Sequence, residues 1–325
     1  MTPDASAGGT EGGRFTLLRD AVVCPFAHEG PVSMRMGVFG AEGDVLADSL
    51  LQRHYATVGR PTEGPPVPEA DVPVVTEPAL YAGPLFNHYG HFLLETLARL
   101  WLSRVFPDRK LVWSVAAGRY RAKLRPWQLA LIRLLGARED CHLVWRPQRF
   151  ADLALGSAGY RIQDRFERHH AAFLGRVPRR LPAAGTGEKL WLSRSGIEGG
   201  GGAAVALEKR LADLGWTVFQ PEAHPLDVQL ERLATADRIA GEEGSALHSL
   251  ALLSGTEGLR VDIFARDPEK PPHKQNGNFE TIARVKELDQ RFHICAADRV
   301  LTRSGSQVEK APLPTDAYLD LLSAA

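Results

Sequence analysis

The fold is decided by residues 236–249, ADRIAGEEGSALHS, which pass from a short apolar run through a glycine-containing turn into a helical pattern. Residues 238–241 are typical of a buried strand, and residues 245–253 have helical periodicity. Gly241 and Gly244 allow a close approach of the backbone, and Ser245 is expected to cap the helix. The free N–H groups of such a first turn, together with the helix dipole, favour a phosphate group.

The same alternation of strand and helix continues on both sides of this stretch. We expect strands at 189–193, 216–220 and 259–265, and helices at 203–214 and 226–235, the latter starting after Pro225. This order predicts a parallel sheet covered by helices on both faces. Ligands bind such sheets where the strands end and the loops turn into helices.

The first half of the chain repeats this order less regularly. Residues 111–115 and 141–145 are predicted strands, and 125–135 is a predicted helix. Residues 1–13 are small and polar, and we expect a disordered lead-in there, with a second irregular stretch at 61–73. A Pro/Gly-rich linker over 173–187 then divides the chain into domains at 14–180 and 181–325.

Composition excludes some classes of protein. The chain has 325 residues, with 39 Lys and Arg balanced by 39 Asp and Glu, so no overall basic charge recruits nucleic acid. Cys24, Cys141 and Cys295 are odd in number and far apart, which argues against a disulfide framework or a zinc knuckle and favours a reducing compartment. Without a long apolar run or a signal-like start, a cytoplasmic location is expected, with peripheral membrane contact as an alternative.

Basic residues cluster in two places. We interpret them as solvated faces, or alternatively as a dock for anionic lipid head groups or a charged acceptor. The clusters are Arg119, Arg121, Lys123 and Arg125, and Arg176, Arg179 and Arg180.

Ionisable groups lie on an otherwise apolar helical pattern in residues 86–101, FNHYGHFLLETLARLW. A helix over 89–104 would bring His88, His91 and Glu95 to one face, which makes a base oriented by a neighbour possible. The alternative is structural: both histidines are bonded to backbone carbonyls, and Glu95 pairs with Arg99 as an ordinary surface ion pair.

A second phosphate-type turn follows the strand at 189–193. Arg194 stands directly after that strand and offers a planar fork of donors to phosphate oxygens. Glu242 and Glu243 would repel a diphosphate unless one turns away or accepts hydrogen bonds from hydroxyl groups. We assign the contact with a sugar or ribose hydroxyl to Glu243.

Three blocks of the sequence together resemble glycosyltransferase family 61, also called DUF563, and in particular its bacterial members associated with capsular polysaccharide or exopolysaccharide synthesis. Residues 87–95, NHYGHFLLE, resemble the family's Asn-Tyr-x-His-Trp-Leu-x-Asp block, and residues 192–194 resemble its Ile-Ser-Arg block. Residues 236–249 resemble its Gly-x-His-Gly-Ala-Gly-Leu-Thr-Asn block. The resemblance covers about residues 81–292. Glu95 replaces the usual Asp, Glu243 the usual His, and His248-Ser249 the usual Thr-Asn.

The resemblance implies an α/β fold of GT-B type, with two Rossmann-like domains that face each other across a cleft. It implies an inverting glycosyltransferase that moves a sugar from a nucleotide sugar, held by the C-terminal domain, to a hydroxyl of a glycan or lipid-linked acceptor. No metal or other cofactor is expected, because Arg194 and the backbone N–H groups around residues 244–247 would stabilise the charge on the departing diphosphate.

Roles for individual residues follow from the resemblance and the residue chemistry together. Glu95 is the preferred base, with a pKa raised by desolvation, while His91 orients it or replaces it; His88 is a further catalytic candidate and Asn87 lies on the acceptor side. Asp262, near the end of a strand, matches an acidic position of the family, or is a turn residue. Asn276 and Asn278 line the donor site, or belong to an Asn-Gly turn. The diphosphate-binding candidates are Arg194, Gly244, Ser245, Ala246, Leu247 and His248.

Two other functions are compatible with the same residues. One is a metal-dependent hydrolase with His88, His91 and Glu95 as ligands, although their spacing is not that of the His-Glu-x-x-His helix. The other is a non-catalytic carbohydrate-binding protein of the same fold.

Overall fold

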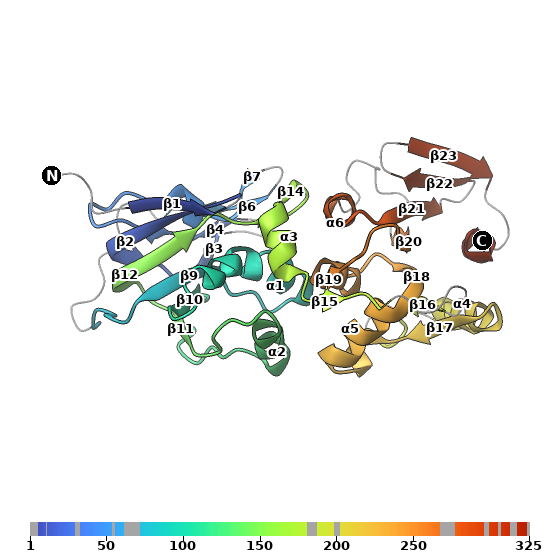
Figure 1. Cartoon of the computed structure of the whole chain (residues 1–325), viewed down its shortest axis with the longest axis horizontal. Helices are drawn as coiled ribbons and strands as arrows, with labels where there is room; N and C mark the ends of the chain where they lie inside the picture. Colours follow the sequence, from blue (N-terminus) through green and yellow to red (C-terminus); the bar gives the residue numbers. More distant parts are fainter. Residues whose placement is uncertain are drawn as a thin grey trace. The chain divides into compact units, whose positions relative to one another are not determined.

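The computed structural model describes residues 6–10, 12–29, 33–53, 56–61, 72–180, 187–197, 202–266, 277–295, 299–304, 307–312 and 317–323. The protein is a mixed α/β chain that divides into two compact units, Met1–Leu174 and Gly175–Ala325 (Figure 1). The division lies near the start of the stretch 173–187 in which the sequence placed a linker. Residues 181–186 of that stretch lie outside the described residues.

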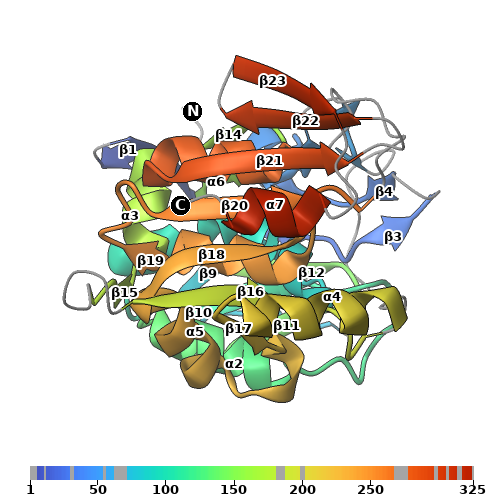
Figure 2. The ribbon, with the colours of Figure 1, turned by 90° about the vertical axis from the view of Figure 1, so that its right-hand side faces the viewer.

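The second unit contains a sheet in the order β17-β16-β18-β20-β21-β22-β23. Its first five strands are parallel, and β22 and β23 extend it as an antiparallel hairpin (Figure 2). The strands are β16 (Glu188–Leu192), β17 (Trp216–Phe219), β18 (Ala236–Glu242), β20 (Arg260–Phe264), β21 (Asp289–Cys295), β22 (Arg299–Ser304) and β23 (Gln307–Pro312). The parallel sheet predicted for this half is therefore confirmed, with two antiparallel strands added at its edge.

Helices cover both faces of this sheet, as the alternation of elements predicts. The connecting helices are α4 (Gly202–Asp213), α5 (Leu226–Thr235), the 3₁₀ helix η4 (Ser245–Leu252), α6 (Asn278–Lys286) and α7 (Ala317–Ser323). Figure 2 shows α4 and α7 on the side of the sheet nearest the viewer. There Trp191, Leu211, Trp216, Phe264 and Leu322 form one buried cluster. Burial of each large apolar side chain stabilises a fold by about 1.5–3 kcal/mol.

The strand order contains a topological switch point. The chain leaves β16, adds β17 on one side of it and then returns to add β18 on its other side, so the loops that follow β16 and β18 diverge. A crevice at the carboxyl ends of the strands forms at such a point and is the usual ligand site of open parallel sheets. Leu192 and Gly241 are register partners at this position.

The first unit has a mixed sheet in the order β1-β2-β12-β9-β10-β11, with β5 also paired to β2. Strands β12, β9, β10 and β11 are parallel, whereas β1 and β2 run antiparallel to their neighbours. The strands are β1 (Ser6–Thr10), β2 (Gly13–Val23), β5 (Val38–Phe39), β9 (Ala79–Pro84), β10 (Lys110–Ser114), β11 (Cys141–Val144) and β12 (Gln148–Gly156). This sheet differs from the Rossmann-like domain that the resemblance implied, because the long strand β2, next to the edge strand β1, runs antiparallel to the four parallel strands.

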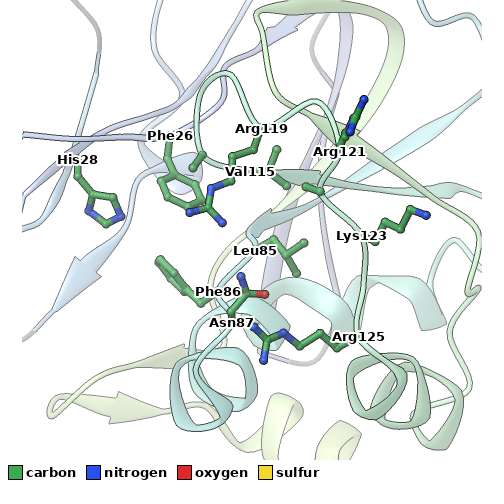
Figure 3. A pocket seen from close by; sticks show the side chains of 12 residues that line it. Phe26, His28, Leu85, Phe86, Asn87, Val115, Arg119, Arg121, Lys123 and Arg125 are labelled. Atoms are coloured by element: carbon green, nitrogen blue, oxygen red, sulfur yellow. The ribbon is translucent and has the colours of Figure 1, made fainter.

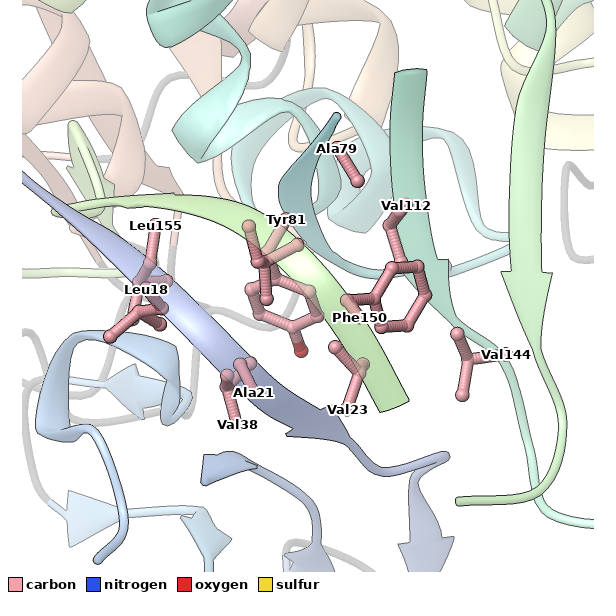
Figure 4. Packing of buried hydrophobic residues seen from close by; sticks show 11 residues of the cluster. Leu18, Ala21, Val23, Val38, Ala79, Tyr81, Val112, Val144, Phe150 and Leu155 are labelled. Atoms are coloured by element: carbon pink, nitrogen blue, oxygen red, sulfur yellow. The ribbon is translucent and has the colours of Figure 1, made fainter. Parts of the chain in front are cut away.

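Figure 4 shows β2 and β12 running obliquely to β9 and β10, so the sheet curls around its own core. Tyr81, Val112 and Phe150 are fully buried in this core. The Tyr81 hydroxyl lies 3.2 Å from Oγ of Ser114, and that Oγ donates to the carbonyl of Cys24 at 2.6 Å. The one polar atom of the aromatic cluster is thus hydrogen-bonded, as a buried hydroxyl requires.

Helices and short strands complete the two units. The helices are α1 (Tyr89–Leu94), α2 (Pro126–Leu134), α3 (Arg168–Leu174) and the 3₁₀ helices η1 (Ala47–Ser49), η2 (Thr96–Arg104) and η3 (Pro221–Ala223). The short strands are β3 (Ala27–His28), β4 (Met34–Arg35), β6 (Gln52–Arg53), β7 (Ala56–Thr57), β8 (Gly59–Arg60), β13 (Tyr160–Arg161), β14 (Arg165–Phe166), β15 (Val177–Pro178) and β19 (Leu253–Ser254).

One sequence expectation about local structure is wrong. Residues 6–10 are not part of a disordered lead-in, because they form β1 and pair with β2 from Ser6↔Leu17 to Thr10↔Gly13; residues 1–5 and 11 lie outside the described residues. The helices predicted over 89–104 and 245–253 are confirmed, but the first changes from α to 3₁₀ geometry at Glu95 and the second is a 3₁₀ helix over Ser245–Leu252. Residues 62–71 of the irregular stretch lie outside the described residues as well.

The described helices include none that is long and apolar enough to cross a membrane. Cys24, Cys141 and Cys295 are free thiols.

Candidate functional site

Arg194 lies at the switch point of the second unit, two residues beyond the end of β16. A Cβ atom added to Gly244, in the loop after β18, would lie 2.6 Å from Nη1 of Arg194. The guanidinium therefore rests against the backbone of the glycine turn, and a larger side chain at position 244 would displace it. Burial, followed by the charge of nearby Arg266, lowers the pKa of Arg194, but a guanidinium with so high an ordinary pKa stays charged at neutral pH.

The loop that carries Arg194 is held by neighbouring hydroxyl groups. Ser193 donates through Oγ to Oε1 of Glu208 on α4 at 2.6 Å, and the backbone N–H of Ser195 donates to Oγ of Ser193 at 3.1 Å. Gln220, which follows β17, donates through Nε2 to Oγ of Ser195 at 3.1 Å. Contacts from two adjacent connections thus fix the backbone on both sides of Arg194.

The glycine turn after β18 is tied to the end of β20. The N–H of Glu243 donates to the carbonyl of Phe264 at 2.9 Å, and a carboxylate oxygen of Glu243 accepts from the N–H of Arg266 at 3.1 Å. One oxygen of Glu243 is thereby engaged by the neighbouring loop. Among the described residues, no partner engages its second oxygen, which can accept a hydrogen bond from a hydroxyl group.

Ser245 does not cap the following helix, contrary to the sequence expectation. Gly244 is the N-cap of η4 and the helix has no side-chain cap. In its first turn the N–H of Leu247 already donates to the carbonyl of Gly244 at 3.2 Å. The anion-binding capacity of this turn therefore rests on Arg194 more than on the helix end.

The remaining donor-site candidates divide into two groups. Ser245 and Ala246 are half-buried and follow Gly244 directly, beyond the carboxyl end of β18. Leu247 and His248 are buried, with exposed fractions of 1% and 6%, and the His248 ring lies 5.2 Å from that of Phe279. Asn278 is the buried first residue of α6, and Asn276 lies outside the described residues.

Asp262 lies in the middle of β20 rather than near a strand end, which corrects the sequence expectation. Its carboxylate is fully buried and accepts from Nε of Arg238 at 2.9 Å and from Nε2 of His293 at 2.8 Å. Arg238 also donates to the carbonyls of Leu321 and Leu322 at the end of α7. These contacts make Asp262 part of the packing between the sheet and α7.

In the first unit, Glu95 stands between α1 and η2 with an exposed fraction of 2%. Arg53 donates to both of its oxygens, from Nε to Oε1 at 2.8 Å and from Nη2 to Oε2 at 3.0 Å. Oε2 also lies 2.5 Å from Nδ1 of His91, one helical turn earlier. The carboxylate is thus held by a bidentate arginine and an imidazole together.

The predicted ion pair between Glu95 and Arg99 is wrong. Arg99 is buried and donates to the carbonyls of Asp48 and Leu50 instead. The switch to 3₁₀ geometry at Glu95 changes the angular spacing along the helix, so residues four apart no longer share a face.

The raised pKa expected for Glu95 is also wrong. Burial by itself raises the pKa, but the hydrogen bonds from His91 and Arg53 outweigh burial and hold the Glu95 pKa below its ordinary value. Glu95 is therefore a charged carboxylate at neutral pH, and it is a weak proton acceptor.

His91 is the accessible member of this pair, since its side chain is 41% exposed. His88, the N-cap of α1, is exposed, and its ring lies 5.2 Å from that of His91. Burial and the proximity of His91 lower the pKa of His88, which favours its neutral form. Asn87 is exposed directly before it.

The structure brings His88, His91 and Glu95 close in space, but not as metal ligands. Glu95 already accepts two hydrogen bonds from a guanidinium. In the described part of the chain, no group of three or more His, Cys, Asp and Glu side chains is arranged to hold a metal ion.

Sequence reasoning missed Arg53, Gln220 and Arg266. Arg53 is 42 positions from Glu95 in the chain, and nothing in its local sequence points to the contact. Gln220 and Arg266 follow the parallel strands β17 and β20, so applying the strand-end rule to every predicted strand would have identified them.

The chain was compared with models of known protein families and with curated proteins, and no match was found in either comparison.

Proposed function

We propose that this protein is an inverting glycosyltransferase that uses a nucleotide sugar. The observation that carries the proposal is the position of Arg194. Its guanidinium rests against Gly244 at the switch point, where the loops after β16 and β18 lead in opposite directions. A cation beside an open glycine turn at the switch point suits the diphosphate of a nucleotide. The three motif blocks that resemble glycosyltransferase family 61 support the same activity.

The chemistry would be a direct displacement. The acceptor oxygen forms a bond to the anomeric carbon, the bond from that carbon to the diphosphate oxygen breaks, and the electron pair leaves with the diphosphate. Arg194 would stabilise the charge that develops on the leaving group, which is the largest electrostatic demand of the reaction. Glu243 would accept a hydrogen bond from a ribose or sugar hydroxyl.

The proton of the acceptor would pass to His91 rather than to Glu95. An ionised carboxylate is only an acceptor, so the short contact with Glu95 Oε2 requires the proton of the neutral ring to sit on Nδ1. Nε2 then carries the lone pair and is the atom that takes the proton. Glu95 becomes the positioning residue, in the way that a buried aspartate orients a catalytic histidine.

In this proposal the two units are the two lobes of a GT-B enzyme. The second unit would bind the donor through Arg194, and the first would supply the base and the acceptor side with His91 and Asn87. A metal ion has no required role, because Arg194 supplies the positive charge.

The test is a thermal-shift screen of the purified protein with nucleoside diphosphates. A ligand that binds only the folded state raises the melting temperature by mass action. We expect one nucleobase to stabilise the wild type, and Arg194→Gln to abolish that shift. Arg284→Gln, which removes an exposed cation on α6, is the matched control and should keep the shift. Equal stabilisation of the wild type and Arg194→Gln would refute the proposal.

A further inference from the structure

The carboxyl ends of β9 and β10 in the first unit lead into a cavity of about 430 Å³. Leu85 and Phe86 follow β9 and form one wall, and Val115 follows β10 and forms another. Phe26 closes a third side through a parallel bridge to Ala116. Small-molecule sites have volumes of about 300–1,000 Å³, so the cavity has the size of a ligand site.

Four basic residues are among those that line this cavity (Figure 3). They are Arg119, Arg121, Lys123 and Arg125, all from the connection between β10 and α2. Although each is exposed, all four line the same space, and no Asp or Glu is among the lining residues. The whole chain has equal numbers of acidic and basic residues, so this concentration of one sign is local.

These cations differ from the arginines that follow them in the chain. Arg133 and Arg138 are paired with Glu139 and Asp140 at 2.7 Å. Among the described residues, none of the four cations at the cavity forms such a pair with a carboxylate. Within the described part of the chain, no carboxylate therefore compensates their positive charge, which is available to an anion.

The frame of the cavity is held by hydrogen bonds. Gln128 is fully buried, its Nε2 donates to the carbonyl of Phe86 at 3.0 Å, and its Oε1 accepts from the N–H of Arg125 at 2.8 Å. The N–H of Ala117 donates to the carbonyl of Phe26 at 2.8 Å. Helix α2 begins at this side with no acidic residue in its first turn, so its dipole adds to the positive potential. The geometry is thus set before a ligand arrives, which favours binding.

The cavity is wider than a phosphate group requires. Phe26, Leu85, Phe86 and Val115 add an apolar surface that suits a sugar ring or another weakly polar body next to the anion. The Phe86 ring also lies 5.8 Å from the His91 ring, so the cavity adjoins the proposed base.

We propose that this cavity binds the phosphate of a phosphorylated acceptor, with the basic residues 119–125 on the phosphate and Phe86 beside the group attached to it. The anion site stands on the cavity and its charges alone, whereas its role as the acceptor site rests on the proposed glycosyltransferase function. The phosphate belongs either to a soluble sugar phosphate or to a lipid head group.

The test is isothermal titration of the full chain with inorganic pyrophosphate at low ionic strength, in variants that separate the two anion sites. Arg119→Gln combined with Arg121→Gln should weaken binding at the cavity at least tenfold, since charge-assisted hydrogen bonds to phosphate are lost. Arg194→Gln should leave binding at the cavity unchanged. The control, Arg168→Gln with Lys189→Gln, removes two exposed cations elsewhere and should behave as wild type.

The outcomes distinguish the two proposals. If Arg194→Gln alone removes all binding, the cavity is not an anion site, and the proposed donor site stands. If only the Arg119/Arg121 variant loses binding, the cavity is confirmed and the donor site fails. Equal weakening in the control would show a general charge effect and overturn the cavity. Arg119→Lys with Arg121→Lys should restore binding, which separates loss of charge from misfolding.

The source of the phosphate is resolved by two further probes. Glucose 1-phosphate tests the soluble source, and phosphatidylcholine vesicles with or without phosphatidic acid test the lipid source. Binding in either arm that is lost in the Arg119/Arg121 variant supports the proposal and names the source, and absence of binding in both arms overturns it.

Discussion

Arg238 and Asp262 face each other across adjacent strands of the second unit, with Nε of the arginine 2.9 Å from Oδ2 of the aspartate. Asp262 is fully buried and Arg238 is 7% exposed. The pair therefore exchanges its contact with water for contacts within the protein, and its loss leaves a buried charge without a partner.

We predict that Asp262→Asn lowers the unfolding free energy of the second unit by about 3–5 kcal/mol, as removal of one partner from a buried pair does. Hydrogen exchange of peptides from residues 236–264 during urea titration measures this. Asp289→Asn, at an exposed carboxylate in the same unit, is the control and should change stability by less than about 0.5 kcal/mol.

The same pair predicts the acid dependence of stability. Burial raises the pKa of Asp262, but the hydrogen bond from His293 and the charge of Arg238 outweigh it and leave the pKa below its ordinary value. A carboxyl with a lower pKa in the folded state binds fewer protons than in the unfolded state, so its contribution is present at neutral pH. That contribution is lost as the pH falls below about 4, the ordinary carboxyl range. Asp262→Asn should flatten the stability of the second unit over this acid range, and an unchanged slope would contradict the assignment.

Gly244→Ala should weaken nucleotide binding more than it affects folding. The added Cβ would lie 2.6 Å from Nη1 of Arg194, and the flexible side chain can move away at little cost to stability. We expect a nucleoside diphosphate to bind about 3- to 10-fold more weakly, which corresponds to about 0.7–1.4 kcal/mol. Titration calorimetry on a double-mutant cycle measures the coupling. In the Arg194→Gln background the alanine should cause no further loss, and an equal loss in both backgrounds would show that Gly244 acts without Arg194.

His91→Gly should lower kcat for sugar transfer by about 10²–10⁴-fold, the usual contribution of a general base, with little change in KM for the donor. Added imidazole should restore part of the rate. Glu95→Gln should lower kcat less, because it removes the group that orients the ring but keeps the ring itself. His142→Gln, at a histidine bonded to Gln148 on a separate strand, should keep wild-type kinetics. A larger loss from Glu95→Gln than from His91→Gly would return the base to Glu95.

The thiols should be inert in the native protein. Burial raises the pKa of Cys24 to about 12 and that of Cys295 to about 11. Burial, followed by the charge of Asp140, raises the pKa of Cys141 to about 11. Because the thiolate is the reactive form and only a fraction on the order of 10⁻³ to 10⁻⁴ of each thiol is ionised at pH 8, the thiols react slowly. Mass spectrometry after treatment with iodoacetamide should show slow labelling of the folded chain and three labels after unfolding. Rapid labelling of Cys24 in the native state would contradict its burial.

Much of the second unit follows from the sequence alone. The helix after Pro225 spans residues 226–235, as predicted. Proline has no N–H group to donate to a neighbouring strand, and it is common at the start of a helix. The strands at 188–192 and 260–264 differ by about one residue from their predicted limits, since continuous apolar runs are typical of strands buried on both faces.

The first unit was harder to predict because its sheet depends on contacts distant in sequence. Strand β2 pairs with β12 from Phe15↔Gly156 to Val23↔Gln148, over a separation that no local pattern reveals. The same holds for Arg53, which lies on the short strand β6, 42 positions before Glu95, and donates hydrogen bonds to its carboxylate. Local pattern placed the histidines and the carboxylate together, but the partner that determines the charge state of that carboxylate comes from tertiary structure.

The change from α to 3₁₀ geometry at Glu95 makes this segment sensitive to insertions and deletions. Residues before the junction present their ionisable groups towards solvent, whereas Arg99, one turn beyond it, is directed inward to hold two carbonyls of the loop around η1. An inserted or deleted residue at the junction would rotate one half of the segment relative to the other, and would misplace both the imidazole and the anchoring guanidinium at once. The length of this segment is therefore more constrained than the identity of most of its side chains.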